Sequence, residues 1–222
     1  MGKSLRFIGI FFLSISALLN IAGGAGTTCV ALNPTGFGDS FTAIADWQWL
    51  YILFVVVTLA FGIMMARGAL LVVKGRQNAY RYAIISLVAA VLVGVIHMVV
   101  SRLLRNSSMP VDGVVYTTIL TLIIFLIFKI PAVWQKVDFT KTKQKDSDTA
   151  GGAAAIVCGA ISLTIQYLLT PTHTINGINY GDAFHLTTTV LGWGLVFFGL
   201  GLIVASRLNL RWPVLRKSSS KA

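Results

Sequence analysis

Apolar residues occur along this chain in six long runs that are separated by short polar segments. A helix that crosses a bilayer needs about 20 predominantly apolar residues, and each run is close to that length. The runs lack the regular polar positions that give a soluble helix one hydrated face. The pattern therefore predicts an all-α fold, a polytopic transmembrane helix bundle of about six spans in one integral membrane domain, residues 1–222. The expected spans are residues 5–23, 47–66, 82–101, 114–133, 151–170 and 186–206.

The composition supports a membrane location. Hydrophobic residues make up 56% of the chain and charged residues 11%. Soluble domains carry about 25% charged residues, so this chain is too poor in charge to hydrate a soluble surface, and the lipid bilayer is its first expected partner. The formal net charge is +11. Because the basic residues flank the apolar runs, as topology signals do, we expect no binding to nucleic acid.

The distribution of Lys and Arg predicts the orientation. Of the 18 basic residues, Arg102 and Arg105 fall on one side of the expected membrane and the others fall on the opposite side. Cytoplasmic segments are enriched in Lys and Arg. We therefore expect a multi-pass plasma-membrane protein with both termini in the cytoplasm, together with the linker 135–149 and the tail 207–222.

The first apolar run permits a second interpretation. Lys3 and Arg6, the apolar stretch Phe7–Leu19 and the small residues at 22–24 also fit a secretory signal peptide. Cleavage would leave five spans and an N-terminus outside the cytoplasm. The sequence leaves both interpretations open.

Short similarities between the expected outer loops suggest an internal repeat. Residues 32–41 contain Leu-Asn-Pro-Thr and then Gly-Asp-Ser-Phe, and residues 169–184 contain Leu-Thr-Pro-Thr and then Gly-Asp-Ala-Phe. The middle loop contains Pro110 and Asp112. The pattern suggests three helical-hairpin repeats, and internal repeats are common in transport folds.

Small residues in the last two spans predict close helix packing. Gly151, Ala155 and Gly159 recur every four residues in the fifth span. The sixth span is rich in glycine, at positions 192, 194, 199 and 201. One interpretation is packing within the chain. The other is an interface with a protein partner or with a second copy of the chain.

Three histidines are the candidate metal ligands. His97 lies near the outer end of the third span, and His173 and His185 lie in or beside the last outer loop. Imidazole can bind a metal or a haem, but the spacing matches no established signature. We therefore predict no cofactor and keep a shared metal or haem site as an alternative. For His97 alone, a hydrogen bond between helices is the simpler interpretation.

A second candidate site is a polar outer mouth that binds a ligand through Asp39, Tyr180, Asp182 and His97. The competing interpretation is that Asp182, like Asp46 and Asp112, precedes a helix and caps its N-terminus.

Two further polar residues lie inside spans, Asn20 and Gln166, and they either line a cavity in the outer half or tie helices together. Cys29 is expected in an outer loop and Cys158 inside a span, so we expect no disulfide between them.

No sequence motif indicates catalysis. The chain has no phosphate-binding GK[ST] loop, paired-histidine zinc helix, Cys-x-x-Cys or GxSxG turn. We therefore expect a non-catalytic membrane protein, either a subunit of a membrane complex or a module that binds a small molecule or lipid. The first alternative is a small-solute transporter or channel, and the second is a histidine-ligated redox subunit.

Overall fold

The computed structural model describes residues 2–137, 139, 144–169, 174–175, 178–179, 182 and 185–208. In this part of the chain, six helices are long and apolar enough to cross a membrane. The predicted all-α transmembrane bundle is thereby confirmed. The long helices are α1 (Gly2–Leu32), α3 (Gln48–Val73), α4 (Ala79–Arg105), α5 (Val111–Phe128), α7 (Gln144–Leu169) and α9 (His185–Arg207).

Short elements connect the long helices. Between α1 and α3 lie η1 (Pro34–Phe37), α2 (Asp39–Thr42) and η2 (Ala45–Trp47). The helix α6 (Pro131–Val137) follows α5. Two short antiparallel strands, β1 (Thr174–Ile175) and β2 (Ile178–Asn179), lie between α7 and α9, with Thr174 opposite Asn179.

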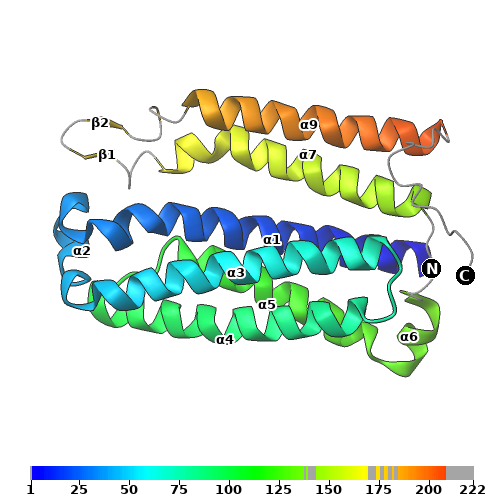
Figure 1. The fold of residues 1–222 in the computed structure, drawn as a ribbon, viewed down its shortest axis with the longest axis horizontal. Coiled ribbons are helices and arrows are strands. Elements are labelled where there is room, and N and C mark those ends of the chain that lie inside the picture. Colours follow the sequence, from blue (N-terminus) through cyan, green and yellow to red (C-terminus); the bar gives the residue numbers. More distant parts are fainter. Residues whose placement is uncertain are drawn as a thin grey trace, which may run out of the picture.

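The long helices form three successive antiparallel pairs, α1 with α3, α4 with α5, and α7 with α9 (Figure 1). The first two pairs form a four-helix unit, and the third pair packs against α1. The connections within the pairs differ in structure, so the repeat suggested by the loop sequences stays a prediction. Helix α1 contacts α3, α5 and α7, and both interpretations of the first apolar run stay predictions.

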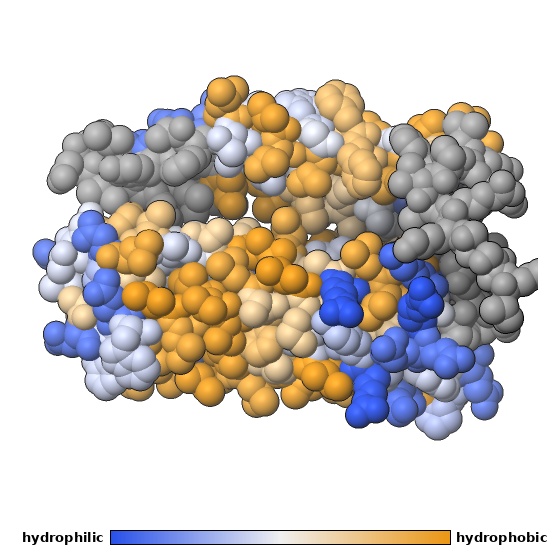
Figure 2. Space-filling view, viewed as in Figure 1, coloured by the Kyte–Doolittle hydropathy of each residue, from blue (hydrophilic) through white to orange (hydrophobic). Residues whose placement is uncertain are grey.

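On the face that Figure 2 shows, apolar residues cover the middle of the described surface, and hydrophilic residues gather toward the two ends. Large apolar side chains of the long helices are exposed, among them Leu92 and Ile96 of α4 and Phe197 of α9. Side chains of this kind suit contact with lipid tails rather than with water.

At the α6 end of the bundle, a buried arginine joins two helices. The Arg6 guanidinium of α1 donates hydrogen bonds to the carbonyl oxygens of Val72, at 2.7 Å, and Val73, at 3.0 Å. These carbonyls end α3, where the helix dipole favours a positive charge. Tyr80 donates to the Phe125 carbonyl oxygen at 2.8 Å beside a cluster of aromatic rings.

Glycines bring α7 and α9 close together. A Cβ atom built on Gly152 would lie 2.6 Å from the Gly199 carbonyl oxygen, and one on Gly159 would lie 2.6 Å from that of Gly192. Packing within the chain is therefore confirmed for this face. The register differs from the prediction, because the closest approach repeats every seven residues and uses Gly152 rather than Gly151. A Cβ on Gly194 or Gly201 would meet nothing within 4 Å.

Several predicted boundaries were wrong. The first helix runs to Leu32 rather than to residue 23, so Cys29 lies in the helix and is exposed rather than in a loop. Gly23 and Gly24 do not end the helix because Val114 and Leu59 pack directly against them.

The predicted linker 135–149 is partly helical. Helix α5 ends at Phe128. Pro131 begins α6, and this position suits a residue without an N–H group. The next long helix begins at Gln144 rather than at residue 151.

Candidate binding cavity

The four-helix unit contains a partly open cavity in its half nearer α2. Its volume is about 20 Å³, measured as the space that the centre of a water molecule can occupy. A cavity needs about 10–15 Å³ on this measure to hold one water molecule, so one or two fit. The lining residues come from α1, α3, α4 and the start of α5, and the polar ones are Asn20, Thr27, Thr58, His97 and Thr118.

Small residues allow the walls to approach one another. A Cβ on Gly23 would lie 2.8 Å from Val114, and a Cβ on Gly94 would lie 2.8 Å from Val115. Both glycines line the cavity. An alanine at either position would force the helices apart or displace a valine into the cavity.

His97 is the most unusual group in the wall. Its side chain stacks on the ring of Phe54, with centroids 4.4 Å apart, and meets the ring of Tyr51 edge-on at 5.4 Å. The residue is 4% exposed, and its Nε2 atom has no hydrogen-bond partner in the described part of the chain. Leaving a buried nitrogen unpaired costs about 1–3 kcal/mol. Nε2 itself has less than 1 Å² of accessible area, so a molecule in the cavity can bond to it only after a small movement of the ring, and that bond would recover this energy.

Asn20 and Thr118 form the floor of the cavity. Asn20 Nδ2 donates to the Ser16 carbonyl oxygen at 2.8 Å and to Thr118 Oγ1 at 3.0 Å. Below them, the hydroxyls of Ser16 and Thr121 share a hydrogen bond of 2.7 Å. These four residues make a polar seam between α1 and α5, so Asn20 both lines a cavity and ties helices together.

Between the cavity and the α2 end, α4 presents Ser101 and Arg105, which follow His97 at intervals of four residues. Ser101 Oγ shares a hydrogen bond of 2.9 Å with the Tyr51 hydroxyl, and both residues are buried. The Arg105 guanidinium lies 3.9 Å from the centre of the Phe41 ring. Polar groups thus continue along α4 from His97 to its last turn.

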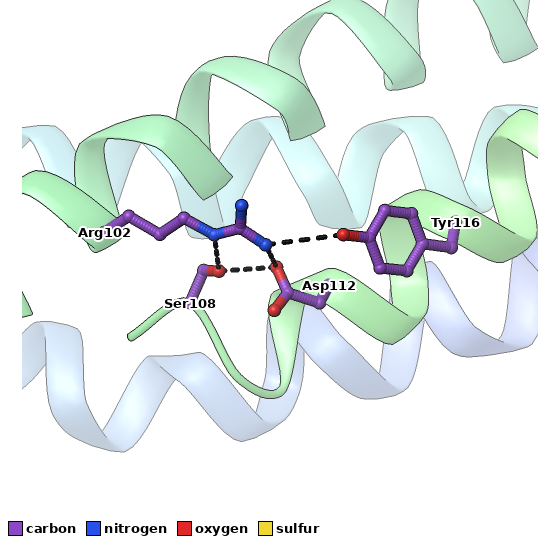
Figure 3. A network of polar contacts seen from close by, with 4 residues as sticks. All are labelled: Arg102, Ser108, Asp112 and Tyr116. Atoms are coloured by element: carbon purple, nitrogen blue, oxygen red, sulfur yellow. Dashed lines mark hydrogen bonds and ion pairs between the residues drawn. The ribbon is translucent and has the colours of Figure 1, made fainter. Parts of the chain in front are cut away.

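A separate polar network closes the turn between α4 and α5 (Figure 3). Arg102 donates from Nε to Ser108 Oγ at 2.8 Å, and from Nη2 to Asp112 Oδ1 and to the Tyr116 hydroxyl, each at 3.3 Å. Ser108 donates to the same Asp112 oxygen. Arg102, Ser108, Asp112 and Tyr116 do not line the cavity, and this network holds the turn in place.

Two of the three predicted aspartate caps, Asp46 and Asp112, are not the N-cap residues of the helices that follow them. Asp112 is the second residue of α5 rather than its N-cap, and the residue before the helix is Pro110. Asp46 lies in η2, and Trp47 precedes α3. Their carboxylates still lie near helix N-termini, where a negative charge is favourable. Asp182 is exposed, and its neighbours lie outside the described residues.

Of the predicted site residues that the structure describes, only His97 lines the cavity. Asp39 is the exposed first residue of α2, and His185 begins α9. Both α1 and α7 lie between α9 and α4 (Figure 1), so His185 and His97 are not brought together.

His173 and Tyr180 lie outside the described residues, as does the side chain of Gln166. Among the described residues, no group of three or more His, Cys, Asp or Glu could hold a metal. The predicted metal or haem site and the polar outer mouth stay predictions.

Sequence reasoning missed the hydroxyl groups of the wall, Thr27, Thr58 and Thr118. A signal was present, since Asn20 and Thr27 are seven residues apart, as are Ala90 and His97, and residues seven apart share one helix face. Comparison with models of protein families, with curated proteins and with solved structures finds no match to this chain.

Proposed function

We propose that this chain is a non-catalytic membrane protein that binds a small molecule in the cavity beside His97. The observation that carries the proposal is the buried Nε2 atom of His97, which has no partner among the described residues and belongs to a side chain that lines the cavity. The charge pattern predicts that the α2 end lies outside the cytoplasm, and we expect the ligand to enter from that side of the plasma membrane.

A thermal-stability screen tests this proposal. A ligand that binds the folded protein raises its apparent Tm, and the rise grows with the logarithm of the ligand concentration relative to Kd. We expect some small alcohol, amide, amine or carboxylate to raise the Tm of the purified protein. His97→Leu should abolish that rise. Ser86→Ala is the matched control, because Ser86 is buried on the same helix, bonds only to the Ala83 carbonyl oxygen at 2.8 Å and does not line the cavity. No rise with any compound, or an equal rise in His97→Leu, would refute the proposal.

Transport of a small solute is the second candidate function. It is favoured by the polar seam, which continues from the cavity floor at Asn20 and Thr118 to Ser16 and Thr121. The aromatic cluster at the α6 end includes Phe125 and Phe128, which are buried, so passage would need this end to open. Solute flux into proteoliposomes that Asn20→Leu lowers would favour transport over binding alone.

A role as a subunit of a larger complex is the third candidate. The face of α9 with Gly194 and Gly201 is free of neighbours within the described structure, and lipid or a partner helix could cover it. Cross-linking in the native membrane would separate these two cases.

A further inference from the structure

We propose that the His97 cavity takes an uncharged molecule of a few heavy atoms that donates a hydrogen bond, such as a small alcohol or a primary amide, with water as the smallest member of the class. This inference rests on the proposed function and specifies its ligand.

The absence of charge in the wall excludes ions. Among the lining residues there is no Asp, Lys or Arg. An ion that enters a buried apolar site without an opposite charge loses its hydration without compensation. The charged groups of α4 beyond His97 are Arg102 and Arg105, and their positive charge opposes a cation.

The polar groups of the wall are mainly acceptors. Both amide hydrogens of Asn20 are used, by the Ser16 carbonyl oxygen and by Thr118 Oγ1. The 2.8 Å contact with a carbonyl oxygen fixes the amide orientation, because a flipped amide would place two acceptors together. The remaining atom, Asn20 Oδ1, is an acceptor.

The threonine hydroxyls show the same bias. Thr27 donates to the Gly23 carbonyl oxygen at 2.7 Å, and Thr118 donates to that of Val114 at 2.7 Å. Each hydroxyl hydrogen is therefore used within its own helix, and the oxygen can only accept a further bond. In the wall, only His97 and Thr58 can supply a hydrogen. A ligand that donates fits this surface better than one that only accepts.

The size of the cavity limits the ligand. With room for one or two water molecules, it admits a molecule of about four heavy atoms only if the helices move slightly. Lipid chains and cofactors are too large, which sets this site apart from a lipid-binding groove.

A titration followed by NMR tests the inference. The full-length protein is placed in nanodiscs with ¹³C-labelled histidine, and the His97 ring signal is assigned by its loss in His97→Gln. Acetamide, acetone and acetate are the probes, because each has four heavy atoms. Acetamide is a neutral donor, acetone is a neutral acceptor, and acetate is an anion. Methylammonium serves as the cation.

We expect acetamide to shift the His97 signal to saturation, while the signals of the other two histidines stay unchanged. Acetone should bind roughly tenfold more weakly, as expected for one lost hydrogen bond. The ions should cause no saturable shift. Asn20→Leu should weaken the binding of acetamide roughly tenfold, because it also removes one hydrogen bond. If that variant does not fold, Gly94→Ala, which narrows the cavity beside Val115, should also weaken it.

The outcomes separate the two proposals. Equal binding of acetone and acetamide, or tighter binding of an ion, would overturn the assigned ligand class. The proposed function, binding of a small molecule in this cavity, would stand. A His97 signal that no probe moves would overturn both the ligand class and the proposed function.

Discussion

Asn20 of α1 donates a hydrogen bond from Nδ2 to Thr118 Oγ1 of α5 at 3.0 Å, and both side chains are buried inside the bundle. Interhelical hydrogen bonds of this kind in membrane proteins contribute about 0.6 kcal/mol on average and up to about 1.7 kcal/mol. The bond links α1 to α5, and both of its residues line the cavity.

The coupling between Asn20 and Thr118 can be measured. A double-mutant cycle with Asn20→Ala and Thr118→Val should give an interaction energy of about 0.5–1.5 kcal/mol in reversible unfolding from detergent micelles. Thr117→Val is the control, since the Thr117 hydroxyl bonds only to the Gly113 carbonyl oxygen of its own helix. A coupling energy of zero would show that the two side chains do not interact.

The glycine contacts between α7 and α9 predict that alanine substitutions at Gly199 and Gly201 differ strongly in their effect on stability. Gly199→Ala places a Cβ 2.5 Å from the Gly152 carbonyl oxygen, so the helices must separate, at a cost of about 1–3 kcal/mol. Gly201→Ala places its Cβ in open space and should leave the free energy of unfolding unchanged or slightly raised. Equal effects of the two variants would contradict the described register.

The hydrogen bonds of Arg6 predict that this basic residue stabilises the fold. Arg6→Gln removes charged hydrogen bonds to the last turn of α3 and should lower the free energy of unfolding by about 1.5–3 kcal/mol. The matched control is Arg81→Gln, because Arg81 is exposed near the start of α4. Unfolding of both variants at the same denaturant concentration would contradict this role of Arg6.

The network at the turn between α4 and α5 predicts a local effect. Ser108 is buried, accepts a bond from Arg102 and donates one to Asp112. Ser108→Ala should therefore speed hydrogen exchange at the backbone amides of residues 106–113. Tyr116→Phe removes only the bond to Arg102 at the surface and should change exchange little. Unchanged exchange in Ser108→Ala would show that the network does not hold the turn.

The two cysteines test the orientation of the bundle. Cys29 is exposed in the last turn of α1 at the α2 end, whereas Cys158 is buried in α7. A maleimide that cannot cross membranes, added outside intact cells, should label the wild type and Cys158→Ser but not Cys29→Ser. Labelling that requires disrupted cells would place the α2 end in the cytoplasm and reverse the orientation inferred from Lys and Arg.

Much of the fold was predictable because hydrophobic length is a local property of the chain. The six apolar runs predict the six long helices, since each run alone satisfies the requirement to span a bilayer. The ends of the helices depend on partners that the sequence does not show. Gly23 and Gly24 look like a helix end, but they lie inside α1 because Val114 and Leu59 pack against them.

The cavity was predictable only in part. His97 and Asn20 stand out because polar residues are rare inside spans. Which helices face one another is a tertiary property, and it determines that Asn20 meets Thr118 while His97 meets Phe54. The chemistry of aspartates and histidines in the loops predicted a ligand or metal site there, but Asp39 and His185 lie outside the cavity that the helices form.

An experimental density map of the protein in nanodiscs, at a resolution that shows ordered water, tests the central claim most directly. We expect density for a non-protein molecule within hydrogen-bond distance of His97 Nε2, in the space above Asn20 and Thr118. A His97 ring that bonds instead to another protein side chain, with the cavity closed around it, would contradict the assignment of this cavity as a binding site.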